Sequence, residues 1–432
     1  MRWKRILKKV NNILSYLSNV MEGHRPTALD VLRIPEYRNF ITGRFFYIMA
    51  LRMVTTIVGW RIYEITHNPL AIGLIGLSEF LPAFCLALYA GHIIDKSDKR
   101  ALLLRTTAAY ALCVVGLLAL AFGPIADSLK NHWIQWLTYT IIFFTGVIRA
   151  FAGPTLNAII AQIVPKEKLP NAVTLNTSAF LTASVLGHAT AGFLIAHTTY
   201  LFCFSVVGVY VIVAWFFIFS LAPKQILVAG EKKTWESIKE GLSFVFHTKE
   251  VLGALALDLF AVLFGGAVAM IPVYARDILK VGPIGFGWLN AADDIGSICM
   301  IMAMTIWPLR RRQGYILLYA VFGFGIGIIV FGLSQLYLLS FLALLCTGML
   351  DGISVVIRGT IVQVKTPDPM RGRVSSVNSM FINSSNELGQ FESGVMARLL
   401  GVVPSVVFGG CMTILVVITT WFKAPSLRKM EY

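Results

Sequence analysis

Charged residues are scarce in this chain. They make up 14% of its 432 residues, whereas 57% are hydrophobic, and the mean hydropathy is +0.74. A soluble domain of this length could not bury so much apolar surface. The composition therefore excludes a soluble globular protein and predicts an integral membrane protein.

Motifs for catalysis and metal binding are also absent. No GxxxxGK[ST] phosphate loop occurs, so we expect no ATP hydrolysis. No convergent nucleophile and base is evident, which argues against an enzyme. The six cysteines show no CxxC spacing and lie singly in apolar segments, which indicates neither disulfides nor a metal site. We expect no cofactor and, since buried acids suit protons, a proton gradient as the energy source.

Long apolar runs recur along the whole chain. Each is about 20 residues long, enough for a helix to cross about 30 Å of hydrocarbon. The pattern predicts an all-α membrane protein of about twelve spans, at 40–63, 70–92, 101–123, 133–160, 172–196, 200–221, 250–277, 284–308, 314–333, 336–362, 374–400 and 403–422. The first run is too long for the core of a signal peptide, so no cleaved leader is expected.

The net charge of +15 has a topological explanation. Lysine and arginine gather in the even-numbered connections and at both ends, and few occur in the odd-numbered ones. This positive-inside pattern predicts cytoplasmic termini in a multi-pass plasma membrane protein. It explains the basic balance without a nucleic-acid partner.

The two halves of the chain resemble each other. Thr145–Arg149 (TGVIR) matches Thr347–Asp351 (TGMLD) 202 residues later, and Gln162 matches Gln363. Six spans in each half predict parallel pseudo-symmetry, as in two-halved secondary transporters. The expected organisation is a cytoplasmic segment with an interfacial amphipathic helix (1–36), a first half (37–222), a cytoplasmic linker with a second amphipathic helix (223–249), a second half (250–423) and a tail (424–432).

Charges inside the spans are candidates for a substrate cavity or proton coupling, because a charge at this depth is costly unless it has a partner or faces water. The repeat pairs Arg149 with Asp351, and a weaker match pairs Arg52 with Asp258. We hypothesise that these four residues form a polar layer around a central cavity. The alternative is a set of static salt bridges that fix helix register.

Other polar residues extend this candidate site. Glu79 lies near the helix-bending Pro82, and Glu387 shares a helical face with Asn383, so Glu387 is a second candidate for proton handling. Arg358, two turns beyond Asp351, could guide an anionic group. His188 is interpreted more readily as a packing residue than as a proton carrier.

The stretch 91–100, GHIIDKSDKR, is interpreted as a short charged turn between two spans. It resembles the signature of the major facilitator superfamily, with Gly91, Asp95, Lys96, Lys99 and Arg100 in matching positions. Arg149–Gly153 resembles the RxxxG element of the fourth helix in proton-coupled antiporters. His188, however, stands where the exporters' fifth helix has the proline of a GP pair.

Three longer stretches are similar to the enterobactin-exporter-like branch, or transmembrane secretion effectors. They begin at Leu257 (LDLFAVLFGGAVAMIPVYARDIL), Asp351 (DGISVVIRGTIVQ) and Met370 (MRGRVSSVNSMFINSSNELGQFESG). The resemblance implies the twelve-helix major facilitator fold, inward-open and outward-open states, and export of a small amphipathic molecule against proton entry.

A cytoplasmic gate follows from the same symmetry. Asp95 lies at the cytoplasmic mouth after the second span, and Arg371 and Arg373 precede the eleventh. We expect a latch between Asp95 and these arginines that closes the cytoplasmic side in the outward-open state. The alternative is solvated charge that only sets topology.

The leading function predicted from the sequence is proton-coupled export of a siderophore-like or drug-like molecule. A symporter or facilitator that imports a nutrient is the first alternative, and a non-transporting scaffold or a membrane-embedded enzyme is a remote one. The expected partners are a small-molecule substrate, protons and the lipid bilayer, with the protein as a monomer.

Overall fold

The computed structural model describes residues 28–223, 234–307, 309, 311–367 and 370–431. The interfacial helix expected within 1–36 lies largely outside these residues. The described chain is helical, with no strand. Its first half contains η1 (Ala28–Arg33), α2 (Pro35–Thr66), α3 (Pro69–Lys96), α4 (Lys99–Ala121), α5 (Gly123–Ser128), α6 (Asn131–Ala158), α7 (Ile160–Ile163), η2 (Lys166–Lys168), α8 (Leu169–His197) and α9 (Tyr200–Phe219).

The linker helix α10 (Thr234–His247) leads into the second half. That half contains α11 (Lys249–Phe264), η3 (Ala267–Met270), α12 (Ile271–Val273), η4 (Tyr274–Ile278), α13 (Gly282–Ile306), α14 (Gln313–Leu333), α15 (Tyr337–Lys365), α16 (Arg371–Leu400), α17 (Val402–Lys423) and α18 (Pro425–Arg428). Each of the twelve predicted spans corresponds to a long helix or, for 250–277, to the broken segment from α11 to η4.

Eleven of these segments are long and apolar enough to cross a membrane, among the residues that the structure describes. The twelfth, α16, has the length but not the hydropathy, because serine, asparagine and two glutamates interrupt its apolar residues. It packs along α3 of the first half, so protein, and not only lipid, surrounds its polar side chains.

The turn predicted at 91–100 is shorter than expected. Helix α3 continues to Lys96, so Gly91 and Asp95 are helical and only Ser97 and Asp98 make the turn. Asp98 caps α4, because its carboxylate accepts a hydrogen bond from the backbone N–H of Arg100 at 2.9 Å. Helix α3 is capped at its start by Asn68 and continues without interruption until the chain approaches Asp98, which caps the next helix.

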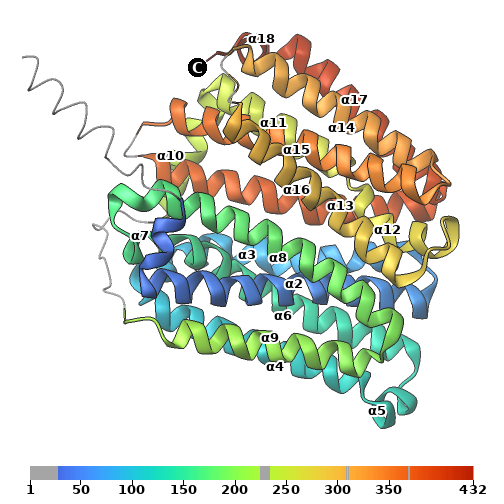
Figure 1. Ribbon diagram of the computed structural model, residues 1–432. Coiled ribbons are helices and arrows are strands. Elements are labelled where there is room, and N and C mark those ends of the chain that lie inside the picture. The colour runs from blue at the N-terminus through green and yellow to red at the C-terminus, as the bar shows by residue number, and fades with distance from the viewer. Residues whose placement is uncertain (1–27, 224–233, 308, 310, 368–369, 432) are drawn as a thin grey trace, which may run out of the picture.

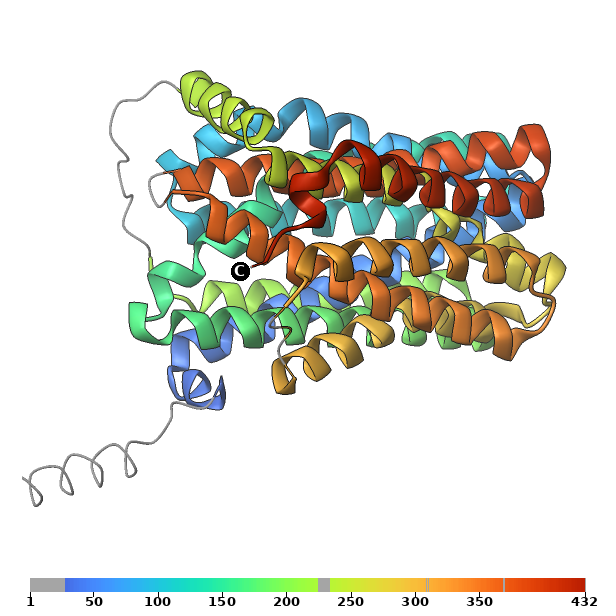
Figure 2. The same cartoon turned by 90° about the horizontal axis from the view of Figure 1, so that it is seen from above.

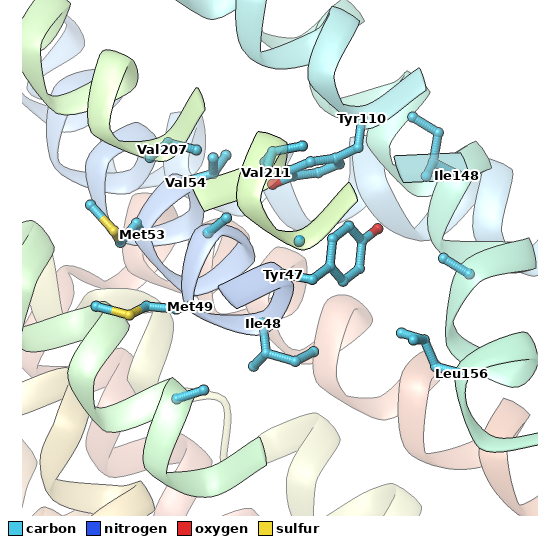
Figure 3. Close-up of a cluster of buried hydrophobic side chains, with 14 of the residues drawn as sticks. Tyr47, Ile48, Met49, Met53, Val54, Tyr110, Ile148, Leu156, Val207 and Val211 are labelled. Atoms are coloured by element: carbon cyan, nitrogen blue, oxygen red, sulfur yellow. The ribbon is translucent and has the colours of Figure 1, made fainter. Parts of the chain in front are cut away.

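The two halves lie side by side as separate bundles (Figure 1). We call the end that carries η1, α10 and α18 the near end, and the end that carries α5 and α12 the far end; Figure 2 shows the same long axis from above. Each half has its own apolar core. That of the first half includes Tyr47 and Tyr110, whose rings meet edge to face at 5.6 Å (Figure 3).

A third apolar cluster joins the halves, and it lies at the far end. Trp60, Tyr63 and Ile72 from the first half pack with residues of η3, α12, η4 and α13 from the second. The rings of Trp60 and Phe286 are 5.2 Å apart, and the Tyr63 hydroxyl donates a hydrogen bond to Asp277. The far end of the bundle is therefore sealed.

The near end is looser. On α8, one helical face carries Val173, Thr177, Ser184 and His188. The last two are buried against the second half, whereas Thr177 is exposed and Val173 is 49% exposed. The same face thus passes from a dry interface at mid-depth to water or lipid toward the near end. The bundle is therefore closed at the far end and parted at the near end.

Candidate functional site

Arg149 on α6 joins the two halves at mid-depth. Its Nη1 lies 3.0 Å from Oε1 of Glu79 on α3, in its own half, and 2.6 Å from Oε1 of Glu387 on α16, in the other half. The Glu387 side chain is 5% exposed and that of Arg149 is 38% exposed. One guanidinium therefore serves two acids, and only the contact with Glu387 must break when the halves move apart.

Local packing explains why Glu79 meets Arg149. Gly146, one turn before Arg149, has no side chain, and a Cβ there would collide with the carbonyl oxygen of Glu79. The close approach of α3 and α6 thus depends on this glycine. Pro82 also borders Gly146 and lies inside α3, where it removes one backbone hydrogen bond.

The second half repeats this packing with different charges. Gly348 on α15 meets the carbonyl oxygen of Asp293 on α13, as Gly146 meets that of Glu79. Asp351 then occupies the position of Arg149. The first half thus has Glu79 and Arg149 at these positions, and the second half has two acids, Asp293 and Asp351. The Thr347 hydroxyl donates a hydrogen bond to Asp293 at 3.4 Å.

Asp258 on α11 forms a buried ion pair with Arg358 on α15. Their side chains are 8% and 5% exposed. Asp258 also lines a small pocket with Asp351 and Ser354, whose cavity volume of about 10 Å³ is close to that of one water molecule. Neither this pair nor the pocket crosses between the halves.

The hypothesised layer of four residues is therefore divided. Arg149 belongs to a group with Glu79 and Glu387, whereas Asp258 and Asp351 lie together in the second half. Arg52 contacts a third group: its guanidinium lies over the Phe180 ring at 5.5 Å, within electrostatic range of Asp293 and Asp294. The side chain of Asn383 lies outside the described residues.

Asp293 and Asp294 are absent from the residues predicted from the sequence. Asp294 accepts a hydrogen bond from the Ser184 hydroxyl at 2.5 Å, and its Oδ2 lies 3.8 Å from Nε2 of His188. The signal was two adjacent acids in the middle of an apolar span. His188, interpreted as a packing residue, is buried and also hydrogen-bonded to Thr56 at 2.7 Å.

The predicted gate residues have mixed roles in this conformation. Lys99 donates to the carbonyl oxygens of Ile94 and Ser97, and Arg100 donates to that of Phe219 at 2.7 Å, so both stabilise the first half itself. Lys96 is exposed, and open space adjoins Gly91.

The arginines that precede the eleventh span, Arg371 and Arg373, were expected to pair with Asp95. Arg373 pairs with Glu240 on α10, so the linker helix binds the second half at the near end. Helix α10 also packs on α3. The side chain of Asp95 lies outside the described residues, so its latch with Arg371 or Arg373 stays a prediction.

Known proteins resemble this chain over most of its length. The family model described as transmembrane secretion effector matches residues 31–432. The uncharacterized MFS-type transporter YfiS of Bacillus subtilis (strain 168) is 23% identical over 412 residues, which cover 90% of this chain and 92% of YfiS. The enterobactin exporter EntS of Escherichia coli is 20% identical over 399 residues, which cover 92% and 94%.

Solved structures share the fold. A D-xylose-proton symporter superposes with a TM-score of 0.72 at 13% identity, covering 93% of this chain and 100% of the symporter. A point mutant of the nucleoside transporter NupG gives 0.73 at 10% identity, covering 90% and 99%. At these identities the likeness concerns the architecture alone.

Proposed function

Because this chain belongs to the transmembrane secretion effector family of the major facilitator superfamily, we propose that it is a proton-coupled exporter of a small amphipathic molecule. It is a multi-pass membrane transporter, and the proposal adds direction, energy source and substrate class. The substrate would be siderophore-like or drug-like, in line with the distant relative named as an enterobactin exporter.

The observation that carries the proton coupling is the bridge from Arg149 to Glu79 and Glu387. While the far end is closed, Arg149 is the shared cation of both acids. When the halves part there, Arg149 stays with Glu79 on its own half and Glu387 loses its cation. An acid at membrane depth without a counter-charge favours its neutral form, so Glu387 would take up a proton at that point in the cycle.

The proposed direction depends on sidedness. Basic residues are concentrated at the near end, where the positive-inside rule places the cytoplasm. The conformation described here would then be inward-open, with the parted near end facing the cytoplasm and both termini cytoplasmic. Protons would enter from the far side of a bacterial inner membrane.

Import on the same scaffold is the second candidate. The observation in its favour is His188, which replaces the proline of the exporters' fifth-helix GP pair. A helix without that proline lacks the bend associated with the antiporter signature. Import would use the same bridge in the opposite order.

The test is accumulation in cells with and without the protein. Two probes are used, a catecholate siderophore and a fluorescent lipophilic dye, each measured before and after a protonophore collapses the proton gradient. Export predicts that loss of the protein raises internal probe, and that the protonophore abolishes the difference. Lower internal probe on loss of the protein would instead indicate import, and a difference that survives the protonophore would contradict proton coupling.

The variant Glu387→Gln tests the bridge directly. Glutamine cannot release a proton, so we expect gradient-driven export to fall at least about tenfold while substrate exchange down its own gradient persists. The matched control is Glu250→Gln, which loosens a pair with Lys365 (3.9 Å) within the second half. Equal loss of both activities in Glu387→Gln, or wild-type export, would refute a coupling role.

A further inference from the structure

Besides the Arg149 bridge and the far-end hydrogen bond from Tyr63 to Asp277, a polar contact between the halves lies at mid-depth, on the seam where α8 packs against α13. Asp294 on α13 receives the Ser184 hydroxyl hydrogen at 2.5 Å, and Nε2 of His188 faces it at 3.8 Å. Both partners are on α8. Every close polar contact described for Asp294 therefore comes from the opposite half.

Asp294 lies at the boundary between the parted near end and the sealed far end of the bundle. Toward the far end, the seam is closed at Gly192 and Gly287, whose backbones touch. Toward the near end, the α8 face beyond Ser184 becomes exposed at Thr177. The Asp294 side chain is itself 16% exposed. Since the seam is closed on the far side of Asp294 and becomes exposed on its near side, we infer that this carboxyl group is reached from the near side.

Rocking of the halves would reverse that access. Opening the far end separates α8 from α13, which removes Ser184 and His188 from Asp294 and exposes the carboxyl group to the far side. A group that faces one compartment at a time, and that changes partners in between, has the two properties that a proton carrier requires.

The polar and charged groups around Asp294 come from both halves of the bundle. They are Ser184 and His188 on α8, Arg52 and Thr56 on α2, Asp293 on α13 itself, and Thr347 and Asp351 on α15. The two side chains that contact Asp294 directly, Ser184 and His188, belong to the first half, as does Arg52. The three acids, Asp293, Asp294 and Asp351, belong to the second half.

We propose that Asp294, positioned by Ser184 and His188, is a second proton-carrying residue of the transport cycle. With the far end closed, the Ser184 hydroxyl and the nearby Arg52 stabilise the carboxylate. With the far end open, Asp294 keeps only Asp293 and Asp351 as charged neighbours and binds a proton. Closure then returns the Ser184 hydroxyl and Arg52 to the carboxylate, which releases its proton to the near side.

This inference rests on the proposed proton coupling, but it can be tested without a substrate. Linkage requires that the state that binds more protons gains population as pH falls. Acidification should therefore open the far end. The distance between spin labels on cysteines placed at Trp133 and Leu336, both exposed at the far end, reports this opening in protein whose six native cysteines are replaced.

The variant Asp294→Asn should have the longer far-end distance already at neutral pH, and its distance should depend less on pH between about pH 5 and pH 8 than that of the parent. Ser184→Ala keeps the carboxyl group but removes its donor. It should keep the pH dependence, with the midpoint raised by roughly one pH unit. The control Asp127→Asn, an exposed far-end acid, should match the parent.

Parent-like pH dependence in Asp294→Asn would overturn the inference, as would a parent-like midpoint in Ser184→Ala. These outcomes are separable from those of the proposed function. Export that ignores the proton gradient, together with an Asp294-dependent distance, would reject the proposed function and leave Asp294 as a proton-binding element. Gradient-driven export with an unchanged Asp294→Asn distance would reject only Asp294.

Discussion

Replacing Gly192 by valine is expected to abolish transport by keeping the far end from closing. A Cβ at Gly192 would lie 2.5 Å from the carbonyl oxygen of Pro283 and 2.8 Å from Cα of Gly287, both on the opposite half. The obstructing atoms are backbone, which cannot rotate away as a side chain can. The halves must therefore stay apart on this seam, and the closed conformation is lost.

The measurement is the reactivity of a cysteine placed at Ile72, a residue of the sealed far-end cluster that is 5% exposed. In Gly192→Val, a membrane-impermeant thiol reagent should label it from the far side, whereas in the parent it should be protected. Gly359→Val is the control, because open space surrounds Gly359 on α15. A protected Ile72→Cys, or undiminished transport, would show that this seam does not form the seal.

Removal of Asp258 should be the most destabilising single change in the candidate site. It would leave the Arg358 guanidinium buried without its counter-charge, which typically costs about 3–5 kcal/mol. The double variant Asp258→Ala/Arg358→Met removes both charges and keeps an apolar chain of similar length. It should recover most of the lost stability, measured as thermal unfolding of the purified protein.

The same pair of variants separates a static role from a transport role. A double variant that is stable and still exports would identify Asp258–Arg358 as a structural pair, as its location within one half suggests. A stable double variant without gradient-driven export would assign the pair to coupling, as the sequence-based hypothesis had it. A single variant as stable as the parent would contradict a buried ion pair.

The sequence predicted the helices well because each apolar run carries its own signal. All twelve expected spans are helical, although α16 is more polar than the others. It also identified Arg149 and Glu387 as separate candidates. It could not join them, because their contact depends on how the two halves dock, and docking of distant segments leaves no periodicity in either one.

Asp293 was missed for a different reason. The repeat was found at a spacing of 202 residues, which relates Gly146 to Gly348, but Glu79 and Asp293 are 214 residues apart. Connections of different length between spans shift the register from helix to helix. A search at one fixed spacing therefore misses equivalent residues such as Glu79 and Asp293. Their equivalence is visible in the structure, because each packs its carbonyl oxygen against a matching glycine, Gly146 or Gly348. The adjacent Asp294 has phenylalanine, Phe80, at the equivalent position, so symmetry alone would never have indicated it.

The polarity of α16 has a consequence for how the protein is made. Segments enter the bilayer during synthesis largely by their own hydrophobicity, and α16 is the one long helix in the described residues that falls short. Its main contact with the first half is α3, which is synthesised some 300 residues earlier. We infer that α16 inserts against an already assembled first half. The second half produced alone should leave this segment outside the membrane, and co-produced first half should restore its insertion.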